Sequence, residues 1–595
     1  MKHLKVALSD SVQSKIKSIA GRTCVGVFET DFTDVGAVVI DDGDLDLVNN
    51  NQISSFGIPI IVLRLDASRD ISLYENRITS IIELLSMSID DCTSEIEKVV
   101  ANYEASILPP FFRALSDYVG DENSQFDCPG HQGGQFFYKH PTGRAFYNFF
   151  GENIFRADLC NADVKLGDLL IHEGYAYDAQ AHAAKIYNAD KTYFVLNGTS
   201  SANKVVLNAL LTPGDIILYD RNNHKSICHG GLVMSGATPI YLETARNPFG
   251  SIGGILDHCF DESYIRQLVA EKSPEKANAK RPIRLAVIQL GTYDGTIYNA
   301  RQVVDKIGHL CDYIFFDSAW VGYEQFIPMM KDCSPLLLEL GPNDPGILVT
   351  QSVHKQQAGF SQTSQIHKKD KHIKGQDRYV DHKHFNNSFM MHASTSPFYP
   401  LFASLDVNAK IHEGELGQTL WRECVEVAID ARKAVLKQCK YLRPLVPPIV
   451  HGKPWEEGNT QEMACDVKYF AFEPEAKWHS FNGYGEGQYF IDPCKFQLIT
   501  PGIDVETGEY EEFGIPANIL ANYLRENRII PEKCDLNTIL FLMTPAESKH
   551  KMDALVAELV RFEELIDLDV PMEEVLPSIY YGHIDKYKGY HIRQL

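Results

Sequence analysis

The stretch GILVTQSVHKQ, residues 346–356, joins an unbroken apolar run to a histidine and a lysine. Such a run is typical of a strand that is buried on both faces, as the strands of a parallel sheet are. Similar runs recur at helix-length intervals in the preceding sequence: TYFVL (192–196), IILYD (216–220), TPIYLE (238–243), RLAVIQ (284–289) and DYIFFDS (312–318). The pattern predicts an open, mostly parallel α/β sheet whose strands are joined by right-handed crossover helices.

Lys355 follows the last of these strands, at the edge where open α/β sheets bind their ligands. A lysine at this edge can be desolvated, lose its proton and form a Schiff base with a carbonyl group. The alternative is a surface lysine in a basic loop, because Lys368, Lys369 and Lys371 follow closely.

The strand TYFVL is followed by NGTSS, residues 197–201, and then by an apolar helical pattern. Glycine lets the backbone approach an anion, and hydroxyl and N–H groups at a helix start can donate hydrogen bonds to it. The segment therefore predicts a phosphate site that includes Thr199 and Ser200. The alternative is a plain helix N-cap by either of these two residues.

Two further strands end in residues that can bind an aromatic ring. His224 follows IILYD, and it either lies flat against such a ring or caps the next helix. Asp317 lies near the end of DYIFFDS, where a buried carboxylate is costly unless a partner compensates it. That partner is either a protonated ring nitrogen or the side chain of a buried arginine or lysine.

Together these strand ends describe a pyridoxal phosphate site, although each signal alone is weak. The lysine would hold the aldehyde, the glycine-hydroxyl turn would hold the phosphate, and the aspartate would keep the pyridine nitrogen protonated. Pyridoxal phosphate is therefore the expected cofactor. No metal site is expected, because the sequence has no Cys-x-x-Cys pair.

The remaining sequence predicts smaller domains on either side of this sheet. Residues 1–105 alternate short apolar runs with amphipathic stretches, which is typical of a small α/β domain that ends near residue 107. After about residue 415, a helix over 417–439 and strands in KYFAFEP and TILFLMTP indicate a smaller α+β domain.

Composition narrows the class of protein. The 595 residues carry a formal net charge of −23, which argues against a nucleic-acid surface or an anionic membrane patch. Thirteen cysteines without a Cys-x-x-Cys pair fit a reduced compartment, so the cytoplasm is the expected location. The sequence shows neither a signal peptide nor an apolar run long enough to span a membrane.

Several longer motifs show a family resemblance: NGTSSANK, DRNNHKS, FFDSAWVGYEQF and QSVHKQQAGFSQTSQIHK resemble the bacterial pyridoxal-phosphate ornithine/lysine/arginine decarboxylases. The similarity runs over the full chain. Within that family it is closest to the enterobacterial inducible or biosynthetic ornithine decarboxylases, through FGENIFRADLCNADVKLGDLLIHEG, HASTSPFYPLFASLDVNAKIHEGE and PGIDVETGEYEEFGIPANILANYLREN.

The resemblance implies a division into domains. Residues 1–107 would form an N-terminal wing of flavodoxin- or receiver-like fold, and residues 108–415 a large domain of the aspartate-aminotransferase type, fold type I of the pyridoxal phosphate enzymes. Residues 416–567 would form the smaller α+β domain. Residues 568–595 would begin a C-terminal domain that extends further in relatives, so the chain is expected to be truncated.

The resemblance also implies roles for single residues. Lys355 would be the Schiff-base lysine, Asp317 the partner of the pyridine nitrogen, and His224 and Ala319 would lie on the two faces of the ring. Thr199, Ser200, Ser352 and His354 would surround the phosphate. A buried Glu532 would bind the distal ammonium of the substrate. Thr395 would come from a partner subunit, so the active unit would be at least a homodimer.

The activity implied is decarboxylation of L-ornithine to putrescine and CO2, in polyamine synthesis or acid stress. Proton transfer to Cα would come from His354, Lys355 or a nearby acid. The alternatives are a lysine or arginine decarboxylase, an aminotransferase with the same cofactor, and a catalytically silent regulatory protein on the same fold. Neither a nucleic acid nor a membrane is an expected partner.

Overall fold

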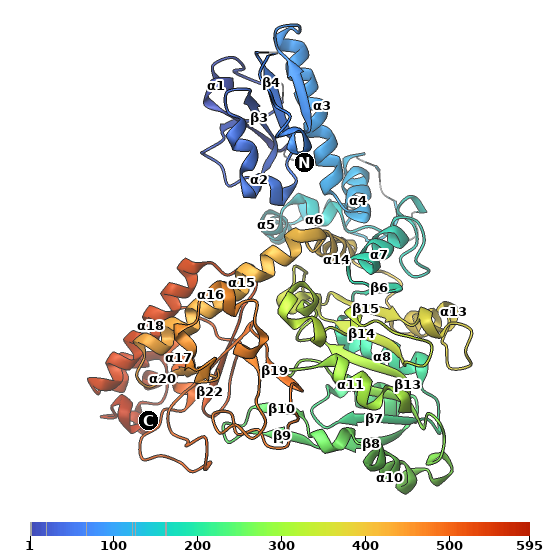
Figure 1. Ribbon diagram of the computed structural model, residues 1–595, viewed down its shortest axis with the longest axis vertical. Coiled ribbons are helices and arrows are strands. Elements are labelled where there is room, and N and C mark those ends of the chain that lie inside the picture. Colours follow the sequence, from blue (N-terminus) through green and yellow to red (C-terminus); the bar gives the residue numbers. More distant parts are fainter. Residues whose placement is uncertain (1–2, 20, 67, 122, 125, 161–163) are drawn as a thin grey trace. The chain divides into compact units, whose positions relative to one another are not determined.

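The computed structural model describes residues 3–595 except positions 20, 67, 122, 125 and 161–163 (Figure 1). Its contacts divide the chain into two compact units. The first comprises residues 1–123 together with 413–416, and the second comprises residues 124–412 together with 417–595. The predicted domain boundaries at residues 107, 415 and 567 are different from this division and stay a prediction.

The first unit is built on a five-stranded sheet in the order β2-β1-β3-β4-β5, and every neighbouring pair is parallel. The strands are β1 (Lys5–Leu8), β2 (Cys24–Gly26), β3 (Val35–Asp41), β4 (Ile60–Arg64) and β5 (Ser80–Glu83). The helices are α1 (Asp10–Gln13), α2 (Asn51–Phe56), α3 (Ile89–Ile107) and α4 (Pro110–Gly120). This strand order is that of flavodoxin-like sheets, as predicted for the wing.

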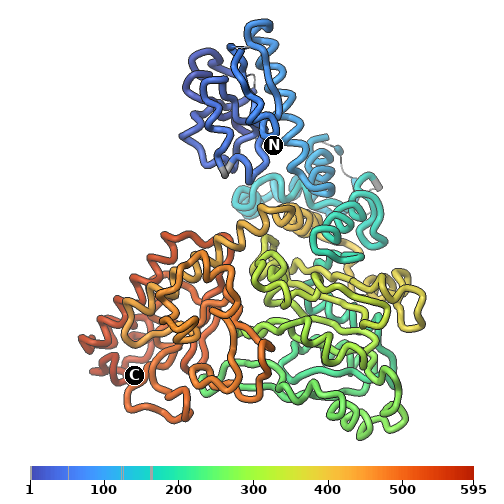
Figure 2. Tube along the Cα trace, viewed as in Figure 1, coloured from blue at the N-terminus to red at the C-terminus, as the bar shows by residue number. Residues whose placement is uncertain are grey.

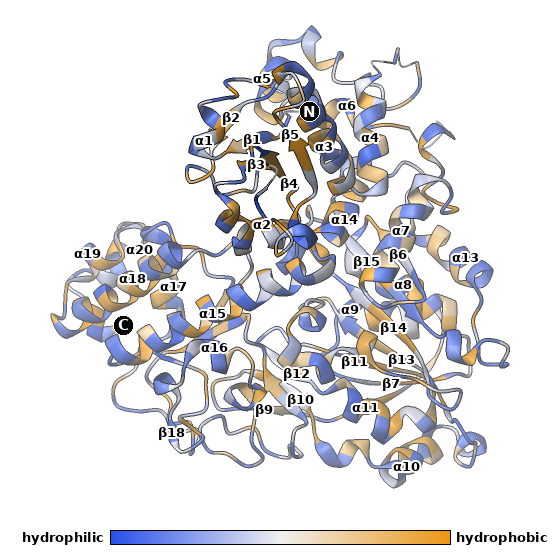
Figure 3. Cartoon of the chain, turned by 45° about the horizontal axis from the view of Figure 1, so that its top comes forward, coloured by the Kyte–Doolittle hydropathy of each residue, from blue (hydrophilic) through white to orange (hydrophobic). Residues whose placement is uncertain are grey.

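Apolar residues of these strands face both sides of the sheet. One cluster, which includes Leu8, Val39 and Leu63, packs against α3, and another, which includes Val38, Ile40 and Val62, packs on the opposite face. The strands are correspondingly apolar in Figure 3. Because both faces are covered, the strands are continuous hydrophobic runs rather than alternating ones.

The second unit contains a seven-stranded sheet in the order β6-β15-β14-β13-β11-β7-β8. Its strands are β6 (Lys191–Val195), β7 (Ile216–Asp220), β8 (Thr238–Leu242), β11 (Ile283–Gln289), β13 (Cys311–Ser318), β14 (Gly346–Gln351) and β15 (Ser364–Lys369). The six predicted strands are all present and mutually parallel, which confirms the predicted sheet.

Strand β15 was not predicted, and it lies antiparallel between β6 and β14. Figure 2 shows this yellow segment beside the much earlier β6. Its sequence SQIHKK is too polar to indicate a buried strand, yet nearly every residue is buried because its polar side chains find hydrogen-bond partners inside the protein.

Helices cover this sheet on both faces. They include α7 (Tyr175–Ile186), α8 (Gly198–Leu210), α9 (Lys225–Cys228), α10 (Glu262–Lys272), α11 (Ala300–Ile307), α12 (Val353–Gln356), α13 (His382–His392) and α14 (Tyr399–Ile411). A large apolar cluster joins α8 and α13 to the sheet through residues such as Val206, Phe315 and Phe385. Two short helices precede this region, α5 (Pro141–Phe150) and α6 (Glu152–Arg156).

A four-stranded antiparallel sheet in the order β16-β20-β22-β21 follows, with strands Arg443–Pro444, Lys495–Ile499, Thr538–Leu542 and Lys533–Cys534. Helices α15 (Gly414–Gln438), α17 (Ala517–Glu526) and α18 (Lys549–Asp567) accompany it. The remaining helices and strands are short: β9 (Thr244–Arg246), β10 (Ile252–Ile255), β12 (Thr296–Tyr298), β17 (Ile449–Val450), β18 (Lys453–Pro454), β19 (Tyr489–Ile491), α16 (Thr460–Met463), α19 (Met572–Val575), α20 (Pro577–Gly582) and α21 (Ile584–Tyr587).

Predictions for this part of the chain were partly wrong. The helix over 417–439 and the strand in TILFLMTP correspond to α15 and β22. The predicted strand in KYFAFEP is instead a 3₁₀ turn, Val467–Phe470, followed by a single bridge between Ala471 and Phe490. The Asp466 side chain accepts a hydrogen bond from the Lys468 N–H, and this local bond favours the turn over a strand.

No helix in the described ranges is both long and apolar enough to cross a membrane.

The basic-loop interpretation of the segment after Lys355 is wrong. Lys368 lies in β15, is only 3% exposed, and forms an ion pair with Asp370. It also donates a hydrogen bond of 2.6 Å to the carbonyl oxygen of Val380, while the Tyr313 hydroxyl donates one of 2.9 Å to Asp370. This lysine is therefore a buried structural charge with a full set of partners.

Replacing Lys368 by alanine should lower the free energy of unfolding by about 3 kcal/mol, because the buried carboxylate of Asp370 would lose its counter-charge. The matched control is Lys371→Ala, since Lys371 is exposed and its loss should cost less than about 0.5 kcal/mol. Thermal unfolding followed by circular dichroism measures both variants. Equal melting temperatures would contradict the structural role of Lys368.

Candidate functional site

The residues predicted to bind the cofactor follow the carboxyl ends of β6, β7, β13 and β14, or lie at those ends. Because these strands are parallel, the residues that follow them meet at one edge of the sheet. Hydrogen bonds link several of these segments across more than a hundred positions of sequence.

Thr199 lies in the first turn of α8 and is buried. Its hydroxyl lies 2.6 Å from the hydroxyl of Ser352 and 2.8 Å from that of Ser364, so three hydroxyl groups from three segments meet here. Gly198 begins the helix with φ of 73°, and an added Cβ would meet open space. Ser200 is exposed on the same turn.

The plain N-cap interpretation of Thr199 and Ser200 is wrong, because both residues lie inside the helix. Asn197 is the N-cap residue, and its side chain makes no capping hydrogen bond. The Gly198 N–H donates a hydrogen bond of 2.8 Å to the carbonyl oxygen of Gln362. An anion at the positive end of this 13-residue helix would meet the N–H groups that follow Gly198.

Asp317 is buried, with 3% of its surface exposed. One carboxylate oxygen accepts a hydrogen bond of 2.9 Å from the Asn203 side-chain amide, and the other accepts one of 3.1 Å from the Ala319 N–H. Among the described residues, Asp317 forms no ion pair with arginine or lysine. The salt-bridge alternative is therefore wrong, and two neutral donors hold the carboxylate in place.

Asn203 connects Asp317 to the rest of the site. Its amide also donates a hydrogen bond of 3.0 Å to the Ser226 hydroxyl, and its oxygen accepts one of 2.8 Å from the Thr350 hydroxyl. Both ends of the Asn203 side chain are thus used, which fixes the direction of the Asp317 carboxylate.

His224 is the N-cap residue of α9, where its Nδ1 accepts a hydrogen bond of 3.2 Å from the Ser226 N–H. His224 is therefore a helix cap, as one of the two interpretations predicted. The cap uses an edge atom of the imidazole, so the face of this ring can still pack against a ligand ring. Partial burial lowers the pKa of His224, which favours the neutral ring.

Lys355 belongs to the short helix α12, and its side chain is partly buried. Its Nζ lies 3.6 Å from the centre of the Trp320 ring. The pKa of the Lys355 amine is lowered to about 8, mainly by burial and also by the charge of Lys495, while Asp317 and Glu532 oppose this change. Part of the amine is therefore unprotonated near neutral pH.

Ser352 and His354 flank this lysine. Ser352 is buried and lies in hydrogen-bond contact with Thr199, so it belongs to the hydroxyl cluster at the start of α8. The His354 Nδ1 donates a hydrogen bond of 2.8 Å to the carbonyl oxygen of Thr363, which fixes the ring beside Lys355.

Glu532 lies near Lys355 but is exposed, so the predicted burial of this carboxylate is wrong for the described chain. The Tyr293 hydroxyl donates a hydrogen bond of 2.8 Å to Glu532, and the Tyr293 ring lies 4.2 Å from the Trp320 ring. Glu532 stays exposed because it lies at the surface, directly before the short strand β21, and not at the end of a core strand. A continuous set of contacts thus runs from the amine through two aromatic rings to a carboxylate.

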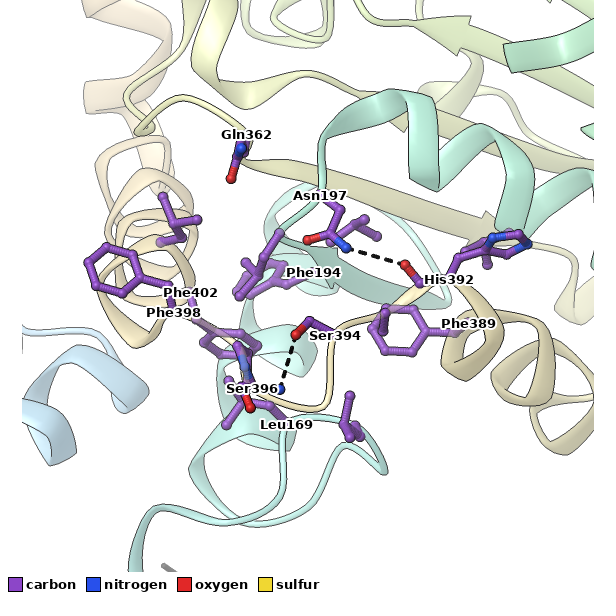
Figure 4. Close-up of a pocket in the computed structure, with 17 residues that line it drawn as sticks. Leu169, Phe194, Asn197, Gln362, Phe389, His392, Ser394, Ser396, Phe398 and Phe402 are labelled. Atoms are coloured by element: carbon purple, nitrogen blue, oxygen red, sulfur yellow. Dashed lines mark hydrogen bonds between the residues drawn. The ribbon is translucent and has the colours of Figure 1, made fainter. Parts of the chain in front are cut away.

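Thr395 lies exposed on the connection between α13 and α14. No hydrogen bond joins it to the other predicted site residues within the part of the chain that is described. Its neighbours Ser394 and Ser396 line a cavity of about 210 Å³, with Asn197 and Gln362 on the opposite wall (Figure 4). Asn197 precedes the turn of Gly198, so this cavity borders the predicted phosphate site.

Four residues of the site were missed by sequence reasoning: Asn203, Tyr293, Trp320 and Ser364. Asn203 had a usable signal, because it lies four positions after Thr199 and hence on the same face of the helix. Ser364 had none, since β15 was not predicted. Tyr293 reaches the site from a loop after β11, which no local pattern indicates.

Residues 109–551 match the family model described as Orn/Lys/Arg decarboxylase, major domain. The chain belongs to this decarboxylase family. It is 63% identical to an ornithine decarboxylase of Haemophilus influenzae and 62% identical to an inducible ornithine decarboxylase of Escherichia coli, with all of this chain and 82% and 81% of those proteins covered. It is 36% identical to an inducible lysine decarboxylase of E. coli, over 88% of this chain and 70% of that protein.

A solved member of the family shares the fold. Lysine decarboxylase A from Pseudomonas aeruginosa superposes with a TM-score of 0.90 at 30% identity, and the comparison covers all of this chain and 83% of that structure. The predicted α/β fold of type I with a wing and a smaller domain is thereby confirmed as a class.

The residues of the site fit pyridoxal phosphate. Three hydroxyls at the positive end of α8 suit a phosphate dianion. The buried carboxylate of Asp317, which lacks a cationic side-chain partner in the described residues, suits a protonated ring nitrogen. The partly unprotonated amine of Lys355 suits an aldehyde carbon.

Replacing Asn203 by leucine should weaken the binding of pyridoxal phosphate about tenfold, since Asp317 would lose a hydrogen bond worth about 1.5 kcal/mol and the direction it sets. Asn208→Leu is the matched control, because Asn208 lies on the same helix and bonds Gly230 and Ser235 instead. Fluorescence titration of the cofactor-free protein measures both affinities. An unchanged cofactor affinity in Asn203→Leu would show that Asn203 does not orient Asp317 for cofactor binding.

Proposed function

We propose that the chain catalyses the pyridoxal phosphate-dependent decarboxylation of L-ornithine to putrescine and CO2. The observation that carries the proposal is the joint placement of Lys355, Asp317 and the hydroxyl cluster at one sheet edge, with a carboxylate close by at Glu532. The choice of ornithine is supported by 60–63% identity to four curated ornithine decarboxylases, against 36% for lysine decarboxylases such as that of P. aeruginosa.

The cofactor would be held by residues from four strand ends. Lys355 would hold the aldehyde carbon and Asp317 the ring nitrogen, while His224 and Ala319 would lie on the two faces of the ring. The phosphate would contact Thr199, Ser200, Ser352 and His354. When bound, pyridoxal phosphate supplies a positively charged ring that accepts the electron pair left by the departing CO2.

The chain's own side chains would orient the substrate and move the proton. Glu532 would bind the distal ammonium group, and the Tyr293 hydroxyl would hold its carboxylate in place. The amine of Lys355, which is partly unprotonated near pH 8, would be able both to bind a carbonyl carbon and to carry a proton. The proton that reaches Cα would come from Lys355 or from His354 beside it.

Product analysis tests the proposed reaction against its alternatives. Incubation with pyridoxal phosphate and equal amounts of ornithine, lysine and arginine should give mainly putrescine by chromatography, with release of carboxyl-labelled CO2. Mainly cadaverine or agmatine would instead establish a lysine or arginine decarboxylase. Retention of the label with formation of a keto acid would establish an aminotransferase, and no reaction would favour a silent regulatory protein.

Replacing Glu532 by glutamine should raise the KM for ornithine at least about tenfold, because a hydrogen bond between charged groups is worth about 1.5–3 kcal/mol. Cofactor affinity should change little, since no cofactor contact is assigned to Glu532. Glu512→Gln, an exposed glutamate of a distant loop, is the control. Steady-state kinetics with ornithine measure both variants, and an unchanged KM in Glu532→Gln would exclude the role.

We further propose that the working form is a homodimer or a larger assembly of this chain. Helix α5 exposes Phe146, Phe149 and Phe150, of which Phe149 is 82% exposed, and Phe136 nearby is 70% exposed. Clustered exposed aromatic rings are typical of protein interfaces. A second copy would cover this surface and, through Thr395, complete the site beside Asn197.

Replacing Phe149 by aspartate should shift the sedimentation distribution of the protein toward the monomer, because a charge would be buried at the interface. Leu73→Asp is the matched control, since Leu73 is 89% exposed in the first unit and belongs to no such cluster. Analytical ultracentrifugation at pH 5.5 and 7.5 measures both and also shows whether acid favours assembly. Identical distributions for the Phe149 variant and the unmodified chain would contradict this interface.

The proposed setting is the cytoplasm, in polyamine synthesis or acid stress. All thirteen cysteines lie in described positions and none forms a disulfide, which fits a reducing compartment.

A further inference from the structure

A second lysine lies buried behind the amine of Lys355. Lys495 is the first residue of β20, and its side chain is 0% exposed. Its Nζ donates a hydrogen bond of 2.6 Å to the carbonyl oxygen of Trp320 and one of 2.7 Å to the Gln356 side-chain oxygen. These acceptors belong to the residue whose ring lies under Lys355 and to the residue that follows Lys355 in sequence.

The carboxylate of Asp492 holds this ammonium group. The distance between Lys495 Nζ and Asp492 Oδ2 is 3.5 Å, and Asp492 is 2% exposed. The Tyr323 hydroxyl also donates a hydrogen bond of 2.7 Å to Asp492. The Lys495 stem packs against Gly295, where an added Cβ would lie 2.7 Å from the Lys495 Cβ. The ammonium is therefore confined from several sides.

Stability alone gives little reason to bury a lysine at this position. Taking an ion pair out of water costs several kcal/mol per ion, and well-packed apolar residues often replace such pairs without loss. Lys495 does, however, tie the start of β20 to the Trp320 backbone and to the Gln356 side chain, on either side of Lys355. The Gln356 amide strengthens this link, because it donates hydrogen bonds to the carbonyl oxygens of Cys494 and Met543.

We propose that Lys495 is a positioning residue for the decarboxylation: it fixes Trp320 and Gln356 beside Lys355 and keeps a second positive charge close to the Lys355 amine. The proposal rests on the proposed function of Lys355 and adds a residue from the smaller sheet to that site. The two ammonium groups share the Trp320 ring, at 3.6 Å for Lys355 and 5.5 Å for Lys495.

The charges around Lys355 show in which direction Lys495 changes the pKa of the Lys355 amine. Asp317 and Glu532 favour the protonated amine, while burial and the like charge of Lys495 favour the neutral amine. His224 also faces this amine and is driven toward its neutral form by burial. Burial lowers the pKa of Lys495 itself below its ordinary value, while Asp492, Cys494 and Glu532 oppose this change and favour the charged form. Without the Lys495 charge, Lys355 should hold its proton to higher pH.

Competitive acetylation with acetic anhydride, followed by peptide mapping, tests the effect of Lys495 on the pKa of Lys355. The experiment uses the full chain after the cofactor is removed. The labelling of Lys355 at a series of pH values gives the pKa of its amine without any turnover. In the unmodified chain we expect half-maximal labelling near pH 8. Half-maximal labelling near pH 10.4, the ordinary lysine value, would overturn the proposal whatever the variants do.

Lys495→Gln keeps a hydrogen-bond donor but removes the charge, and Lys495→Met supplies a second neutral variant of similar length. Either should raise the pKa of Lys355 by about one unit, which lowers its labelling near pH 7 about tenfold. Lys495→Arg should restore the original value. Lys433→Gln is the matched control, because Lys433 bonds Gly458 and Thr460 in the same part of the chain. A pKa that stays at the original value in the neutral variants would overturn the proposal.

The pH profile of kcat for ornithine is the second measurement, because it reports groups of the enzyme–substrate complex, where the Lys355 amine is free. The limb set by Lys355 should move to higher pH in Lys495→Gln and return in Lys495→Arg, whereas a merely structural role would lower kcat without moving the limb. An equal displacement in Lys495→Arg and Lys495→Gln would overturn the role of the charge. Absence of decarboxylation with a displaced labelling pKa would count against the proposed function and leave the effect of Lys495 standing.

Discussion

The site depends on one constraint, which is that an amine and a carboxylate share a poorly hydrated edge of a sheet. Burial lowers the pKa of the Lys355 amine, while the carboxylate of Asp317 a short distance away opposes that shift. A buried carboxylate is stable here because neutral donors, Asn203 and the Ala319 N–H, satisfy it without a permanent counter-charge. This leaves Asp317 able to stabilise a cationic ligand, as the nitrogen of a pyridoxal ring would be.

The parallel sheet makes this arrangement possible. Its strands present their carboxyl ends at a common edge, so that residues distant in sequence meet without long loops. The hydroxyl cluster shows the result, since Thr199, Ser352 and Ser364 come from three separate segments and lie within hydrogen-bond distance. Strand β15 supplies the last of them, and it also contains Lys368, whose buried charge serves the sheet rather than the site.

The other side of the site comes from the smaller antiparallel sheet. Lys495 at the start of β20 reaches Trp320 and Gln356, and Glu532 beside β21 reaches Tyr293. Lys355 and Glu532 are therefore linked through the aromatic pair of Trp320 and Tyr293. On the opposite flank, a cavity is lined by Asn197 and by the connection that contains Ser394 and Ser396.

The sequence by itself determined the strands of the large sheet and the residues at their ends. Continuous apolar runs of this length, repeated at helix-length intervals, favour buried strands of a parallel sheet. Charged or glycine-containing segments directly after them indicate a ligand edge. Lys355, Asp317 and Thr199 were found in this way, and the family motifs around them extended the set to Glu532 and Thr395.

Only the tertiary structure decided which interpretation of each residue holds. A helix start does not reveal that Asn197, rather than Thr199, is its N-cap, and a polar segment such as SQIHKK does not reveal that its side chains are satisfied inside a sheet. The residues around Lys355 could not be predicted from the sequence either, because Trp320, Tyr293 and Lys495 come from separate segments of the chain. Hydrogen-bond partners and desolvation are properties of distance in space, and no local pattern of residues encodes them.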